Sequence, residues 1–178
     1  MSQTRIAYMP LAADPEAIPD ESILAATSFA GSLDCALHLT TFALDVPPVS
    51  SPLGNLVVDI RGLARAAEER SKAECHRIQG LIQGAAGSGL SVHCTSRQVA
   101  MGTTMDVAAA EARYFDLVVL PWSPESLGAQ EMAQAIVFGS GRPAILVPPS
   151  VHPARLDHIA VAWDASRVAA RALGDALP

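Results

Sequence analysis

The stretch that decides the fold begins Tyr114-Phe-Asp-Leu-Val-Val-Leu-Pro-Trp122 and closes, after a loop and a helical segment, with Gly139-Ser-Gly-Arg-Pro-Ala-Ile-Leu-Val-Pro-Pro149. Leu117 to Leu120 is an unbroken apolar run, which is typical of a strand buried on both faces of a parallel sheet. Ala144 to Val147 is a second such run. Between the two runs, five apolar residues recur at the spacing of one helix face: Ala129, Met132, Ala133, Ile136 and Val137. The stretch therefore predicts a strand, a right-handed crossover helix and a parallel strand.

The rest of the chain continues this alternation. Further strands are expected at Arg5–Leu11, Cys35–Val46, Leu90–Val99 and His158–Trp163, and helices at Asp20–Gly31, Asp59–Gln83, Thr103–Arg113, Ala129–Phe138 and Ala165–Leu177. Strands that alternate with helices in this way predict an α/β protein with a doubly wound, Rossmann-like parallel sheet.

Composition and charge narrow the function classes. The chain has 178 residues, half of them hydrophobic, and a formal net charge of −6. This negative charge argues against a protein that binds nucleic acids or anionic membranes in general, because both carry negative charge themselves. Acidic residues come too early for a signal peptide, and no apolar run is long enough to span a bilayer. Three cysteines without C-x-x-C spacing suit a reducing compartment, so we expect a cytoplasmic protein.

Three pieces of the chain together resemble the universal stress protein family. They are Leu37-His-Leu39, the segment Ala112 to Val119, and Gly141-Arg-Pro-Ala-Ile-Leu-Val-Pro148. The resemblance covers residues 1–149 as one domain. It implies an adenine-nucleotide α-hydrolase-like fold, in which a five-stranded parallel sheet has the order 3-2-1-4-5.

The end of the chain is similar to the start of another such domain. Ile159-Ala160 repeats Ile6-Ala7, and Trp163-Asp-Ala-Ser166 is similar to the family's first strand end. We therefore expect a linker at 150–156, then the first strand and helix of an incomplete second repeat at 157–178. By this resemblance Asp164 matches the aspartate that contacts nucleotide in the family, with a helix-capping role as the alternative.

ATP-binding members of the family resemble one another in a glycine signature after the fourth strand. Glycines let backbone N–H groups approach phosphates, and the following helix N-terminus favours negative charge. Counting back from Pro143, Gln130 and Glu131 occupy the place of the signature's final Gly-Ser, and only Gly128 remains nearby. The sequence therefore predicts that ATP is not bound in the family manner.

The remaining loop residues support that prediction. Pro121 and Pro124 lack amide donors, and Glu125 adds negative charge. In a doubly wound sheet, ligands bind where the strand order reverses, here at the carboxyl ends of the first and fourth strands. The residues expected to line that cleft are Leu11, Ala12, Pro121, Trp122, Ser123 and Gly128. We identify no catalytic group, and the five histidines show no metal-ligand spacing.

Three functions remain open. The first is a universal stress protein domain without cofactor or catalysis, acting in stress response or regulation as a homodimer or tandem pair joined along the fifth strand. The second is an ATP-binding universal stress protein with a modified phosphate loop, or a weak ATPase. The third is a relative that binds another ligand in the same cleft.

Overall fold

The computed structural model describes residues 5–14, 16–47, 59–87, 89–150 and 158–176. Five parallel strands form one sheet in the order β3-β2-β1-β4-β5, as predicted. The strands are β1 (Ile6–Ala12), β2 (Ala36–Asp45), β3 (Val92–Ala100), β4 (Leu117–Pro121) and β5 (Ala144–Val147). The helices are α1 (Asp20–Ser32), α2 (Ile60–Ala85), α3 (Thr104–Ala112), α4 (Leu127–Gly139) and α5 (Arg167–Ala176).

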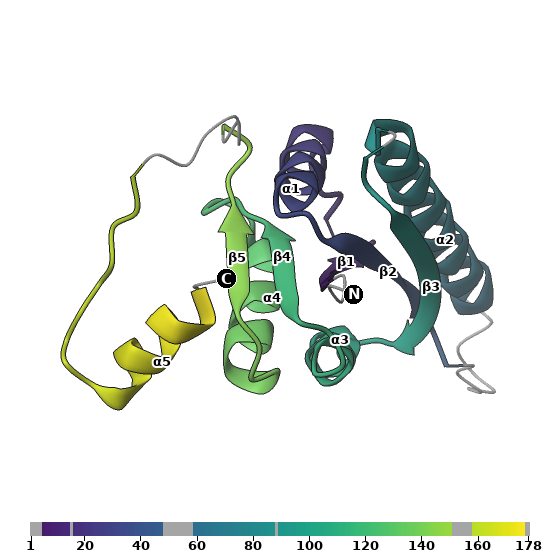
Figure 1. The fold of residues 1–178 in the computed structure, drawn as a ribbon. Helices are drawn as coiled ribbons and strands as arrows, with labels where there is room; N and C mark the ends of the chain where they lie inside the picture. The colour runs from purple at the N-terminus through teal and green to yellow at the C-terminus, as the bar shows by residue number, and fades with distance from the viewer. Residues whose placement is uncertain (1–4, 15, 48–58, 88, 151–157, 177–178) are drawn as a thin grey trace.

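Helices cover both faces of this sheet, because strand side chains point alternately to the two sides. Met9 and Leu11 of β1 pack with α1 and α2 on one face. Tyr8 of the same strand packs with α3 and α4 on the other face. Every residue of β4 is buried, which confirms its predicted central place. Figure 1 shows these elements around the sheet, with β5 and β3 at its two edges.

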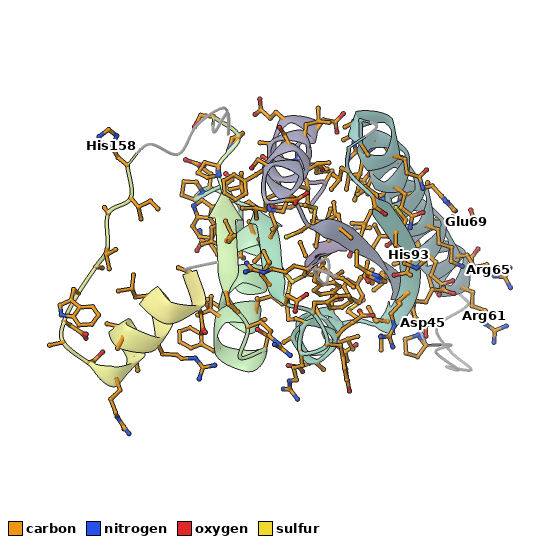
Figure 2. All side chains as sticks on the ribbon, viewed as in Figure 1. Asp45, Arg61, Arg65, Glu69, His93 and His158 are labelled. Atoms are coloured by element: carbon orange, nitrogen blue, oxygen red, sulfur yellow. The ribbon has the colours of Figure 1, made fainter. Side chains whose placement is uncertain are left out.

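The long helix α2 has one apolar face and one charged face, as its sequence pattern predicts. Ile78 and Ile82 are fully buried against the sheet. Arg61, Arg65 and Glu69 point away from the sheet (Figure 2). This division between an apolar and a charged face is the pattern of a surface helix of a globular domain.

The end of the chain departs from the prediction. His158–Trp163 is not a strand: its side chains are exposed and it pairs with no strand of the described chain. A strand is defined by backbone hydrogen bonds to a neighbouring strand, and His158–Trp163 forms none with the described strands. The expected helix does form as α5, but none of its residues is buried, and it lies apart from the sheet beyond β5 (Figure 1). Most of the expected linker lies outside the described residues.

The hydroxyl group of Tyr8 lies in the core between the sheet and the helices α3 and α4. The hydroxyl of the buried Tyr8 donates to Oε2 of Glu111 at 2.8 Å, and its ring stacks on Phe115 with centroids 4.5 Å apart. Arg97 Nη1 lies 3.6 Å from Glu111 Oε1. Burial first, and then the hydrogen bond to the Glu111 carboxylate, raise the pKa of Tyr8 above its ordinary value of 10.0.

We expect Ile136→Ala to lower the free energy of unfolding by about 2–5 kcal/mol, because this fully buried side chain would leave a cavity. Its neighbour Val137 also belongs to the predicted apolar stripe but is 50% exposed, so Val137→Ala is the matched control and should change stability by less than about 1 kcal/mol. Urea denaturation measures both variants. Equal losses would contradict the described placement of α4.

We expect Tyr8 to make the protein less stable in alkali. Above about pH 10 the unfolded chain loses the phenolic proton while the folded chain keeps it, so the unfolding free energy falls as pH rises, by up to about 1.4 kcal/mol per pH unit. Urea denaturation at about pH 9 and about pH 11 should show this loss in the parent and a smaller loss in Tyr8→Phe. Tyr114→Phe is the control, because Tyr114 is 86% exposed and should leave the slope unchanged. A Tyr8→Phe slope equal to that of the parent would contradict the assignment.

Candidate functional site

A cleft opens at the carboxyl ends of β1 and β4, the reversal point of the strand order. Its walls come from β1 and the segment after it, from α1, from α3, and from the loop that leads into α4. The lining residues are Pro10, Leu11, Ala12, Asp14, Glu16, Ile18, Pro19, Ser22, Met105, Pro121, Trp122, Ser123, Ser126, Gly128, Ala129, Glu131 and Met132.

Pro10 explains why the two central strands separate there. The carbonyl of Arg5 accepts from β2, and that of Ile6 accepts from Asp116 beside β4, so even-numbered residues of β1 face β4. Pro10 is even-numbered and has no N–H to donate across that gap. In agreement, the β1–β4 register ends at the Tyr8 pair, whereas β1 stays paired with β2 as far as Ala12.

The cleft is narrow and mostly apolar. Its volume is about 60 Å³, room for a few water molecules. Three acidic residues line it, Asp14, Glu16 and Glu131, whereas no lysine, arginine or histidine is among the lining residues. Ser22 of α1 is 3% exposed and lines the cleft. The electrostatic character of the lining is therefore negative.

The loop between β4 and α4 uses many of its polar groups internally. The hydroxyl of Ser123 donates to Glu125 at 2.7 Å, which lowers the pKa of that carboxyl. The Gln130 amide donates to the carbonyl of Pro124 at 2.7 Å, and the Trp122 N–H donates to Val147 at 2.9 Å. A phosphate would have to compete with these bonds for the same donors.

The helix α4 begins two residues earlier than expected. We expected it to begin at Ala129, but it begins at Leu127. Ser126 sets this start, because its Oγ accepts from the N–H of Ala129 at 3.2 Å. Glu131 consequently lies one turn inside the helix and still lines the cleft. The preference of serine for the N-cap was the signal in the sequence that could have corrected the predicted start of this helix.

The structure brings the six residues of the expected cleft together: Leu11, Ala12, Pro121, Trp122, Ser123 and Gly128 all line it. Sequence reasoning missed Ser22, Met105 and Met132, which reach the cleft from three different helices. Their contribution depends on how those helices pack on the sheet, and no local pattern in the sequence shows that.

Asp164 lies elsewhere, in the exposed segment before α5. Its Oδ1 accepts from the N–H of Ser166 at 2.9 Å, and hydrogen bonds from Ser166 lower the pKa of its carboxyl. Ser166, not Asp164, caps α5, since its Oγ accepts from the N–H of Ala169 at 3.1 Å. Asp164 is thus outside the residues that line the cleft, and it acts locally on the turn before the helix.

None of the helices in the described part of the chain combines the length and the apolar character that a membrane span requires. The sequence matches no protein-family model, and no curated protein matches it in sequence.

Solved structures do match the fold. The universal stress protein UspA from Lactobacillus plantarum has a TM-score of 0.50 at 16% identity, over 82% of this chain and 99% of that chain. A universal stress protein family member from Burkholderia pseudomallei has a TM-score of 0.48 at 14% identity, over 80% and 96% of the two chains. A family protein from Arabidopsis thaliana with AMP bound has a TM-score of 0.45 at 11% identity, over 80% and 91%. With the strand order 3-2-1-4-5 and helices on both faces, this chain therefore has the fold of the universal stress proteins.

Proposed function

We propose that this chain is a universal stress protein domain that acts in stress response or regulation through protein association rather than through nucleotide turnover. The observation that carries the proposal is the lining of the cleft, which combines proline walls and three carboxylates with no cationic side chain. A site for a triphosphate needs the opposite set of groups, namely free N–H donors and positive charge.

Magnitudes favour exclusion of a phosphate over its binding. The N-terminus of α4 attracts an anion by about 0.3–1 kcal/mol. A carboxylate about 4 Å from a phosphate repels each unit of its charge by roughly 1 kcal/mol in water, and by more in a partly desolvated cleft. At such a distance, the carboxylates of Glu131 and of the two acidic residues in the β1–α1 segment would together repel a phosphate by more than the helix dipole attracts it.

The alternative is an adenine-nucleotide site in the same cleft. One feature favours it: Gly128 lies in the first turn of α4 and lines the cleft, so backbone N–H groups are close to any ligand there. Other solved universal stress proteins of similar fold contain cAMP, dAMP or AMP. Those ligands belong to those proteins, and for this chain ATP as cofactor stays the second candidate.

Isothermal titration of the full chain with Mg-ATP should show no affinity tighter than about millimolar, which corresponds to roughly −4 kcal/mol. A universal stress protein that binds ATP serves as positive control under the same conditions. Micromolar affinity for Mg-ATP that is lost in Trp122→Ala, a residue in the wall of the cleft, would overturn the proposal and establish nucleotide binding in this cleft.

Association is the second part of the proposal, and its surface is the β5 edge. β5 has only four residues, and Leu146 on it is 38% exposed. An edge strand presents unpaired backbone groups to another chain. In the segment before α5, three apolar side chains are more than half exposed: Ile159, Val161 and Trp163. Burying them at an interface would stabilise the complex by roughly 25 cal/mol for each Å² of apolar surface removed from water. We propose that this segment docks along β5, in its own subunit or a partner's, and that the protein is a dimer.

Light scattering should give a dimer mass for the full chain and a monomer mass for the double variant Ile159→Asp/Val161→Asp. A chain ending at Pro149 should also be monomeric, and should fold, because the described core lies within the sheet and helices α1 to α4. Leu63→Asp is the control, since Leu63 is 62% exposed on α2, away from β5, and should leave the dimer intact. Equal masses for the parent and the double variant would contradict the proposal that this segment mediates dimerisation.

The cytoplasmic location remains part of the proposal, and the cysteines support it. Cys35, Cys75 and Cys94 are free thiols. Burial raises the pKa of each thiol, so all three stay protonated and unreactive near neutral pH. Free thiols such as these, two of them buried and one half-buried, are usual in a reducing compartment.

A further inference from the structure

A pair of imidazoles lies on the open part of the sheet, away from the cleft. His38 on β2 and His93 on β3 are register partners, so their side chains project from the same face. Their ring centroids are 4.9 Å apart and the rings are inclined by 44°. The two positions are distant in the sequence, so only the pairing of β2 with β3 brings them together.

Packing and a hydroxyl hold the His38 ring in place. It lies against Phe115, with centroids 4.9 Å apart, and beside Tyr8, at 6.2 Å. Thr95 Oγ1 is 3.4 Å from Nε2 of His38 and donates to the carbonyl of Leu39 at 3.3 Å. Thr95 Oγ1 also lies 3.0 Å from Thr40 Oγ1. Its oxygen can accept from Nε2–H of His38, and in that tautomer Nδ1 keeps its lone pair. Such a partner on the second ring nitrogen is the usual support of a metal-binding histidine.

The pair is accessible, and a carboxylate and a guanidinium lie near it. His93 is exposed on the edge strand β3, where Figure 2 labels it. Burial first, and then the neighbouring His93, lower the pKa of His38, while the Glu111 carboxylate acts in the opposite direction. Arg97 Nη1 lies 3.6 Å from Oε1 of that carboxylate. An incoming cation therefore meets one half-buried imidazole that is packed against aromatic rings and one exposed imidazole.

We propose that His38 and His93 together bind a divalent transition metal ion of the imidazole-preferring class, Ni²⁺, Cu²⁺ or Zn²⁺. Imidazole nitrogens lie about 2.0–2.1 Å from such an ion, and two rings bound to one ion at near-tetrahedral angles have centroids roughly 5 Å apart. The observed 4.9 Å matches that separation.

The donor count sets the character of this site. Among the described residues there is no group of three or more histidine, cysteine or acidic side chains placed to hold a metal. Water completes the coordination, so the ion exchanges readily and does not serve as a structural centre of the fold. Bound there, it would join the edge strand β3 to β2.

Isothermal titration of the untagged full chain with NiCl₂, in a buffer free of chelators, should give one ion per chain. His93→Ala should weaken binding by about 100-fold, because the second imidazole of a pair acts at high effective concentration. His38→Phe should show the same loss while it keeps an aromatic ring against Phe115. His76→Ala is the matched control, because this exposed histidine on α2 lies outside the pair and should leave the affinity unchanged.

A second measurement locates the ion. Substoichiometric Ni²⁺ should broaden the imidazole proton resonances of His38 and His93 before those of the other histidines, because paramagnetic broadening is local. The proposal is overturned if the parent binds Ni²⁺ no more tightly than His93→Ala, if His76→Ala loses as much affinity, or if other histidines broaden first.

Discussion

Pro10 stands in the central strand of a parallel sheet, where a residue normally donates to one neighbour and accepts from it. Its missing N–H faces β4, and the pairing of β1 with β4 ends two residues before it. A backbone donor lost inside a sheet is unfavourable unless the acceptor finds another partner. Here the strands separate toward their carboxyl ends, and the cleft lies at this separation. The position of the candidate site therefore depends on a hydrogen bond that the chain cannot make.

The same residue type limits what the cleft can hold. Pro10 on β1 and Pro121 on β4 both line the cleft, and neither has an N–H, so both strands lack a donor where a backbone amide could have met a ligand. The α4 helix contributes a positive N-terminal end, but Ser126 already satisfies the N–H of Ala129, and Glu131 adds a negative charge. A narrow apolar cleft with acidic residues along it supports the proposal that the domain does not bind ATP.

The two edges of the sheet differ in physical character. β3 is nine residues long and carries polar, exposed side chains such as Arg97 and Gln98, which keep an edge strand from pairing indiscriminately. β5 is short and apolar, with Leu146 partly exposed, and the apolar segment around Val161 is unpaired on that side of the molecule. β3 is therefore the polar edge of the sheet and β5 the apolar edge, and the proposed association is placed at the apolar one.

Much of the fold was determined by the sequence alone. The run Leu117–Leu120 could be read as a buried strand because the burial of both its faces removes any alternation of polar residues, and the long amphipathic helix α2 showed its two faces directly. The cleft residues on β1 and β4 also followed, because the strand order places their carboxyl ends together. The tertiary structure decided the rest. Ser22, Met105 and Met132 reach the cleft only through helix packing, His38 meets His93 only through strand register, and His158–Trp163 lacks a strand partner although its residues favour one. Local propensity is a property of neighbouring residues, whereas pairing and packing join residues that are distant in the chain.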